Sequence, residues 1–205
     1  TEKSNLFSAP DTYMEKIAIG AGLPKNLLDL DNSISKNIEL LADAKNTTPE
    51  NLTACILDRP RHKKIIENLK DLKVNIEYIA DGDVSGIISI LDDNSPVDIY
   101  LGTGGAPEGV LAAAALSCLG GQIQTRLVLE NNQINRAKKM GVTDPNKKYN
   151  IDELIRGDVM FFATAITNGE IVKGIKDKGD FFEASTFALH KNSKTNKKIT
   201  NTLKK

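Results

Sequence analysis

The segment from Gly102 to Gly109 combines four glycines with a single carboxylate, and these residues could bind a ligand. Glycines let a ligand approach the backbone closely and leave N–H groups exposed. Glu108 is the only acidic residue between Asp98 and Glu130. A carboxylate in the first turn of a helix is also favoured by the helix dipole, so Glu108 is either a divalent-cation ligand or a helix-stabilising residue. The segment contains neither a Walker motif nor the GxGxxG of a dinucleotide site.

Two arginines flank a proline in the sequence Asp58-Arg59-Pro60-Arg61-His62. A guanidinium group donates two hydrogen bonds at once to a phosphate, and a proline restricts the backbone between the two side chains. Cations near a helix N-terminus oppose the helix dipole, and a bound anion would remove this conflict. Without a ligand, Arg59 and Arg61 are two surface arginines in a loop, and both interpretations stay open.

Two carboxylates flank a glycine at Asp81-Gly82-Asp83. Such a pair can accept hydrogen bonds from sugar hydroxyls, can hold a divalent cation, or can cap the helix that follows. Capping and ligand binding are compatible, because an aspartate at a helix start is held in a fixed orientation. Arginines, aspartates and Glu108 together suit a phosphorylated polyol with a metal rather than a nucleic acid.

A repeated β-loop-α pattern places these three segments. Apolar strands are predicted at 53–57, 74–80 and 97–101, and amphipathic or Ala-rich helices at 62–72, 84–91 and 108–119. This order predicts an α/β fold, with a mostly parallel sheet and flanking helices. The carboxyl ends of parallel strands meet at one edge of the sheet, so we expect the three segments to line one crevice.

The rest of the chain divides into a start, a main domain and a tail. Residues 1–12 are predicted to be a linker or a truncated connection, and the chain does not begin with Met, which indicates a fragment or a processed product. Residues 13–190 form the predicted domain, in which 13–19 are a strand or the start of a helix, and 170–175 and 181–189 are strands. Residues 191–205 are polar and Lys-rich, and we expect a solvated, frayed tail.

The composition excludes several classes of partner. Lys plus Arg and Asp plus Glu both number 27, so no net field attracts nucleic acid. The longest apolar stretch, Val110 to Leu119, is too short to span a bilayer, and no secretory signal is visible. Cys55 and Cys118 lie in apolar runs without zinc-type spacing, as expected for reduced thiols of a cytoplasmic protein. Neither a nucleic acid nor a membrane is therefore expected as a partner.

These motifs resemble those of the class II fructose-1,6-bisphosphatase family, a branch of the lithium-sensitive, metal-dependent sugar and inositol phosphatases. The resemblance extends to about Asn192. Its main carriers are Tyr13-Met14-Glu15-Lys16-Ile17, Leu57-Asp58-Arg59-Pro60-Arg61-His62, Asp81-Gly82-Asp83-Val84 and the run from Gly104 to Ala115. Further matches are the run from Gly120-Gly121 to Arg126-Leu127, Met140-Gly141, Arg156-Gly157-Asp158 and Thr167-Asn168-Gly169.

The resemblance implies a reaction, a metal and a set of ligands. The reaction is hydrolysis of the C1 phosphate of fructose-1,6-bisphosphate to fructose 6-phosphate in gluconeogenesis, and some photosynthetic relatives also use sedoheptulose-1,7-bisphosphate. The metal is Mn²⁺ or Mg²⁺, with Glu108 matching one of its ligands. Family members are often oligomeric, which implies a homo-oligomer for the full-length protein. The positions that match sugar-phosphate contacts are Tyr13, Arg59, Pro60, Arg61, Asp81, Gly82, Asp83 and Gly105.

One departure from the family pattern limits the implied activity. The other metal ligands of the family precede the position of Tyr13, in acidic clusters that this chain does not contain. We therefore expect the C-terminal part of a layered sugar-phosphatase fold that is inactive alone. The alternatives are a non-catalytic sugar-phosphate-binding or regulatory module of the same fold, and an inert domain whose charges are caps and surface residues.

Overall fold

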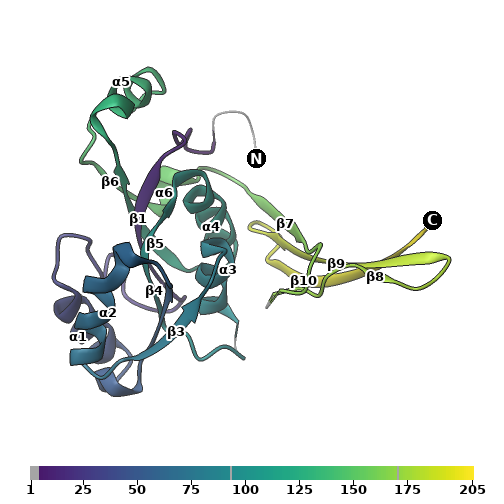
Figure 1. Cartoon of the computed structure of the whole chain (residues 1–205), viewed down its shortest axis with the longest axis horizontal. Helices are drawn as coiled ribbons and strands as arrows, with labels where there is room; N and C mark the ends of the chain where they lie inside the picture. Colours follow the sequence, from purple (N-terminus) through teal and green to yellow (C-terminus); the bar gives the residue numbers. More distant parts are fainter. Residues whose placement is uncertain (1–4, 93, 170) are drawn as a thin grey trace.

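The computed structural model describes residues 5–92, 94–169 and 171–205, which form a body of sheet and helices and a projecting arm (Figure 1). The strands of the body are β1 (Tyr13–Ile19), β2 (Thr53–Leu57), β3 (Asn75–Ile79), β4 (Ile99–Gly105), β5 (Gln122–Val128) and β6 (Lys148–Asn150). Its α-helices are α1 (Ile34–Ala44), α2 (Lys63–Asp71), α3 (Asp83–Ile88), α4 (Ala106–Leu119), α5 (Asn131–Lys139) and α6 (Ile151–Leu154). Short 3-10 helices occupy Pro49–Asn51, Pro60–His62 and Ser89–Leu91.

The body is built on a six-stranded sheet in the order β3-β2-β4-β1-β5-β6. Strand β2 pairs in parallel with β3 and β4, which confirms the α/β class and the parallel β-loop-α strands predicted from the sequence. Residues 13–19 are a strand, which resolves the open choice between strand and helix. This strand, β1, runs antiparallel to β4 and β5 along its whole length, with Tyr13 opposite Gly105 and Val128.

Helices cover both faces of this sheet (Figure 1). Helices α1 and α2 share one apolar cluster with the sheet, and α3 and α4 belong to another. Helix α1 is capped at its start, because the Ser33 hydroxyl accepts a hydrogen bond of 3.1 Å from the Lys36 amide. The alanines of α4 are buried, and their small side chains let this helix pack closely on its neighbours. No helix among the described residues is long and apolar enough to cross a membrane.

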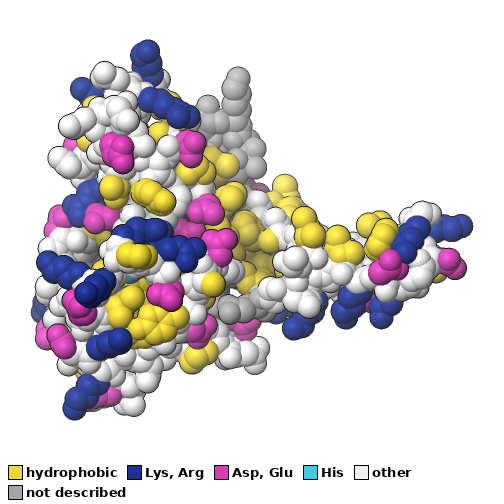
Figure 2. All heavy atoms as spheres, in the orientation of Figure 1, with side chains coloured by type: hydrophobic (Ala, Val, Ile, Leu, Met, Phe, Trp, Pro, Cys, Tyr) yellow, Lys and Arg dark blue, Asp and Glu magenta, His cyan; other side chains and the backbone are white. Residues whose placement is uncertain are grey.

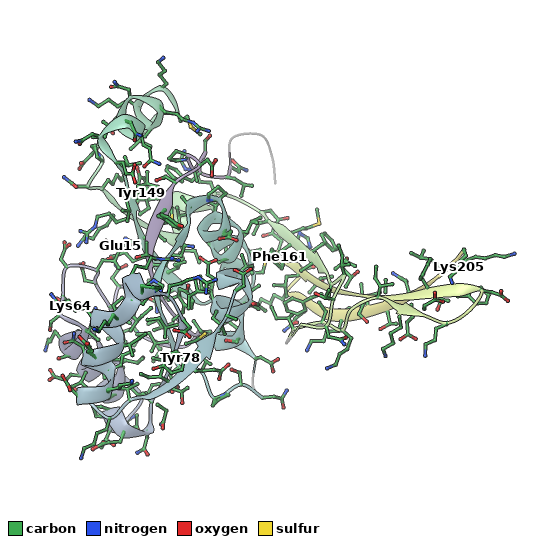
Figure 3. All side chains as sticks on the ribbon, in the orientation of Figure 1. Glu15, Lys64, Tyr78, Tyr149, Phe161 and Lys205 are labelled. Atoms are coloured by element: carbon green, nitrogen blue, oxygen red, sulfur yellow. The ribbon has the colours of Figure 1, made fainter. Side chains whose placement is uncertain are left out.

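The arm is a second, antiparallel sheet in the order β10-β9-β7, with β8 also paired to β9. Its strands are β7 (Met160–Thr164), β8 (Lys176–Asp177), β9 (Phe181–His190) and β10 (Thr195–Lys204). In Figure 3, Phe161 lies where the arm leaves the body, and Lys205 lies toward its far end. Phe161, Phe187 and Leu189 are buried in the same apolar cluster as α4, so one face of the sheet fixes the root of the arm.

The prediction of a frayed tail is wrong, because residues 195–204 form strand β10. This strand pairs with β9 over all ten of its residues. The lysines suggested a solvated coil, but charged side chains are also typical of an edge strand, where they discourage further pairing. The strand predicted at 170–175 is also wrong for its described part, since residues 171–175 lie outside the strands; Glu170 lies outside the described residues.

The predicted connection at 1–12 is described only from residue 5 onward. Leu6 forms an isolated antiparallel bridge with Ile155, and the Phe7 amide donates a hydrogen bond of 2.8 Å to the Leu154 carbonyl. The Phe7 ring also packs on Tyr149, with the two centroids 4.6 Å apart. Residues 5–7 are therefore attached to the body next to α6 before the chain enters β1.

Candidate functional site

The Gly-rich segment is not a loop, which corrects the sequence interpretation. Gly102 to Gly105 are the last residues of β4, and α4 begins at the next residue, with Glu108 in its first turn. The glycines make room for carboxylates. A Cβ at Gly104 would lie 2.0 Å from Asp83 Oδ2, and a Cβ at Gly105 would lie 2.6 Å from Glu108 Oε2. These two glycines allow both acidic side chains to lie against the end of β4.

Asp83 is held by Lys16, which the sequence motifs do not mark as a site residue. Asp83 is the first residue of α3, follows Gly82 in the left-handed region at φ 83°, and is 3% exposed. Its Oδ2 atom forms an ion pair with the ammonium group of Lys16, which is 1% exposed. Burial lowers the pKa of Lys16, and this effect outweighs the opposing influence of Asp83. The sequence did contain a signal, since period-two alternation in β1 places Lys16 on the same face as the buried Met14.

Glu108 lies next to this ion pair at the start of α4. Much of its side chain is exposed, yet partial burial of its carboxyl group raises its pKa, and a hydrogen bond with Asp83 acts in the same direction. Lys16 and the backbone amide of Gly105 act in the opposite direction. Two acidic groups and one ammonium group therefore share the carboxyl end of β4, where they can accept and donate hydrogen bonds to a polar ligand.

Arg61 reaches the same end of the strand from the segment after β2. Its Nε atom donates a hydrogen bond of 2.8 Å to the Thr103 carbonyl, and its guanidinium lies 4.9 Å from the centroid of the Tyr13 ring. Tyr13 is opposite Gly105 in the sheet. The structure thus brings together five predicted site residues: Tyr13, Arg61, Asp83, Gly105 and Glu108.

The remaining predicted residues form the rim. Arg59 Nη2 lies 3.9 Å from Asp81 Oδ1, and the Asp81 side chain is 97% exposed. Pro60 begins the 3-10 helix Pro60–His62 directly after Arg59, and Gly82 supplies the left-handed turn before α3. A separate hollow of about 410 Å³, lined partly by Ile88, Leu119 and Phe187, contains none of these residues. The charged groups gather at the strand ends and not in that hollow.

His62 connects the segment after β2 to β4. It is 1% exposed, and its Nδ1 lies 2.8 Å from the Leu57 carbonyl, while Nε2 accepts a hydrogen bond of 2.8 Å from the Thr103 amide. This arrangement requires a neutral ring with the proton on Nδ1. Burial lowers the pKa of His62, with the nearby Arg61 adding to the effect. His62 therefore fixes Arg61 relative to Thr103 at neutral pH.

A pH dependence of stability follows for His62. In the unfolded chain the His62 ring takes up a proton near pH 6.5, whereas in the folded chain it stays neutral to a lower pH. The free energy of unfolding should therefore fall as the pH drops below about 6.5. Denaturant titrations between about pH 5 and 8 would measure this slope. A His62→Gln chain should lose the His62 contribution, and a His190→Gln chain should keep it. Equal slopes in wild type and His62→Gln would contradict the prediction.

The donor set can be compared with the needs of a divalent cation. Among residues 5–92, 94–169 and 171–205, no group of three or more His, Cys, Asp or Glu side chains could hold a metal ion. Asp83 and Glu108 lie together at the carboxyl end of β4, and Lys16 already provides a positive charge beside them. These described residues do not by themselves fit a complete Mn²⁺ or Mg²⁺ site, which ordinarily needs more oxygen ligands.

The fold and this cluster define an α/β domain that gathers arginine and carboxylate side chains at the carboxyl ends of parallel strands, the usual ligand position in such sheets. The family follows from sequence comparison. The model described as "Bacterial fructose-1,6-bisphosphatase, glpX-encoded" matches residues 1–203. The chain belongs to this family of class II fructose-1,6-bisphosphatases.

Individual relatives support the assignment. A fructose-1,6-bisphosphatase class 2 of Haemophilus influenzae is 35% identical over 212 residues, covering 96% of this chain and 63% of the relative. A D-fructose 1,6-bisphosphatase class 2/sedoheptulose 1,7-bisphosphatase of Synechocystis sp. is 36% identical over 190 residues, covering 86% of this chain and 55% of the relative. The chain thus spans between about half and two thirds of the length of these relatives.

Proposed function

We propose that this chain supplies the substrate-binding side of a fructose-1,6-bisphosphatase that removes the C1 phosphate to yield fructose 6-phosphate, as a cytoplasmic step of gluconeogenesis. The observation that carries the proposal is the convergence of Arg61, Tyr13, Asp83 and Glu108 at the end of β4, in a chain of this family. Sedoheptulose-1,7-bisphosphate is a second candidate substrate, because several relatives carry both activities in their names.

The proposed roles follow from the chemistry of each side chain. Arg59 and Arg61 bind the phosphate that is retained, since guanidinium groups donate paired hydrogen bonds to phosphate oxygens. Asp81 and Asp83 accept hydrogen bonds from sugar hydroxyls. The remaining members shape the surface on which the sugar phosphate lies: Tyr13, Pro60, Gly82 and Gly105.

Glu108 is proposed as one ligand of a Mn²⁺ or Mg²⁺ ion. Its place in the first turn of α4, beside Asp83, suits a carboxylate that faces a ligand. The other ligands would come from polypeptide outside the described residues, which contain no complete site. When complete, such a site supplies a metal-activated water and offsets charge on the departing phosphate. This chain alone is therefore proposed to bind sugar phosphates without hydrolysing them.

The alternative is a non-catalytic sugar-phosphate-binding or regulatory module. It is favoured by the buried ammonium of Lys16, which balances the acidic groups without a metal. Mixing experiments distinguish the two proposals. The chain would be combined with the portion of the Haemophilus influenzae relative that precedes the matched region, and phosphate release from fructose-1,6-bisphosphate would be measured with Mn²⁺. Release supports the enzyme, whereas binding of fructose 6-phosphate without release supports the module.

A homo-oligomer is also proposed, through the outer face of the arm. The strand register places five exposed apolar side chains on this face, opposite the buried Phe161 and Leu189: Met160, Phe162, Phe182, Ile199 and Leu203. Figure 2 shows hydrophobic side chains along this part of the arm. Exposed apolar patches of this kind mark interaction sites, and the formal net charge of zero does not oppose self-association. The mass in solution, measured by light scattering, should exceed 22.3 kDa and return to that value for Phe162→Ser.

A further inference from the structure

Lys16 is a charged side chain enclosed in the middle of the sheet. It lies on β1 between β4 and β5, opposite Gly102 and Thr125, and its side chain is 0% exposed. An ammonium group in such a place is costly unless it is paired and held in a good geometry. The Lys16–Asp83 ion pair satisfies this requirement across 67 residues of sequence.

Two glycines determine where the Lys16 side chain can lie. A Cβ at Gly109 would be 3.0 Å from Lys16 Cε, and a Cβ at Gly104 would be 3.1 Å from Lys16 Nζ. The stem of the lysine therefore passes close to α4, and its ammonium group rests against the end of β4. Asp83 is held at this point beside Glu108, and the charges of Glu108 and Arg61 both act on the Lys16 ammonium group.

We infer that Lys16 is a positioning residue for substrate binding. It holds the Asp83 carboxylate at the carboxyl end of β4, where Asp83 can accept a hydrogen bond from a sugar hydroxyl. This inference rests on the proposed function, in which Asp83 contacts the sugar. Lys16 itself does not touch the ligand, because its side chain is fully buried. The phosphate subsite depends on Arg59 and Arg61 and should work without Lys16.

The test compares two probes on the whole chain. Fructose 6-phosphate and inorganic phosphate would be titrated into wild type and Lys16→Met, a substitution that keeps the stem and removes the charge. The dissociation constant for fructose 6-phosphate should rise about tenfold or more, as expected for losing a hydrogen bond to a charged group. The constant for inorganic phosphate should change less than about twofold. Lys45→Met is the matched control, since Lys45 pairs with Asp98 away from the site and should leave both constants unchanged.

A comparison that does not use Lys16→Met covers the case in which this variant fails to fold. Lys16→Met/Asp83→Asn replaces the ion pair by neutral groups of similar size. If Lys16 acts through Asp83, the double variant binds fructose 6-phosphate no more weakly than Asp83→Asn alone. Weaker binding by the double variant than by Asp83→Asn, or wild-type affinity in folded Lys16→Met, would overturn the inference. Failure of the wild-type chain to bind fructose 6-phosphate would instead overturn the proposed function.

Discussion

Replacing Gly104 by alanine should lower the free energy of unfolding by about 3–5 kcal/mol, the range for breaking one side of a buried ion pair. The added Cβ would lie 2.0 Å from Asp83 Oδ2 and 3.1 Å from Lys16 Nζ, and neither side chain is free to move away. Asp83 is fixed at the start of α3, and Lys16 is enclosed in the sheet. One of the two must therefore move, and the ion pair must open. Denaturant unfolding of the two chains measures the difference.

The control for this prediction is a glycine with space around it. A Cβ at Gly169 would meet its nearest atom, the Val172 carbonyl oxygen, at 3.6 Å, which is ordinary contact. Gly169→Ala should change the free energy of unfolding by less than about 1 kcal/mol, as is usual for a site without a special constraint. Equal stability of Gly104→Ala and Gly169→Ala would show that the end of β4 does not hold Asp83 and Lys16 as described.

Replacing Arg61 by alanine should weaken the binding of fructose 6-phosphate by about 10- to 100-fold, because a hydrogen bond to a charged group contributes about 1.5–3 kcal/mol. Arg61 combines its exposed guanidinium with a fixed backbone contact at Thr103 and a stacking contact on Tyr13. These contacts orient the group before a phosphate arrives, so little side-chain entropy is lost on binding. Isothermal titration of both chains with fructose 6-phosphate measures the change.

Arg136 provides the matched control, since it is exposed on α5 and belongs to no part of the candidate site. Arg136→Ala should bind fructose 6-phosphate as wild type does. Equal heats from wild type and Arg61→Ala would remove Arg61 from the site. Such a result would favour an inert domain, in which the arginines are ordinary surface residues. An equal loss in both variants would indicate a general effect of charge rather than a local contact.

The sequence was sufficient for the parallel part of the sheet and for much of the site. Apolar strands followed by amphipathic helices gave the β2, β3 and β4 units, and polar residues at the strand ends marked Arg61, Asp83 and Glu108. The role of Gly104 was not predictable, because this glycine leaves room for the Asp83 side chain, which comes from the segment after β3. A glycine pattern alone does not distinguish an open loop from a strand that must leave room for a neighbour.

Other features depend on long-range pairing that local patterns do not contain. Lys16 is buried because β1 lies between β4 and β5, and the sequence of β1 alone does not show those neighbours. The Lys-rich end of the chain forms β10 because each of its ten residues has a pairing partner on β9. A local pattern rich in lysine does not show this partner strand. The motif around His62 does not show its structural role, which arises from hydrogen bonds of its ring to the Leu57 carbonyl and the Thr103 amide.

We propose that this chain binds the substrate of the family at the end of β4 without hydrolysing it. Titration of the isotope-labelled chain with fructose-1,6-bisphosphate and Mg²⁺, followed by amide and phosphorus NMR, tests both parts in one sample. We expect amide shifts at residues 59, 61, 62, 81–83 and 102–105, with both phosphate signals of the sugar unchanged in area over hours. Shifts confined to the hollow lined by Ile88, Leu119 and Phe187, no shifts, or steady release of inorganic phosphate would contradict the account.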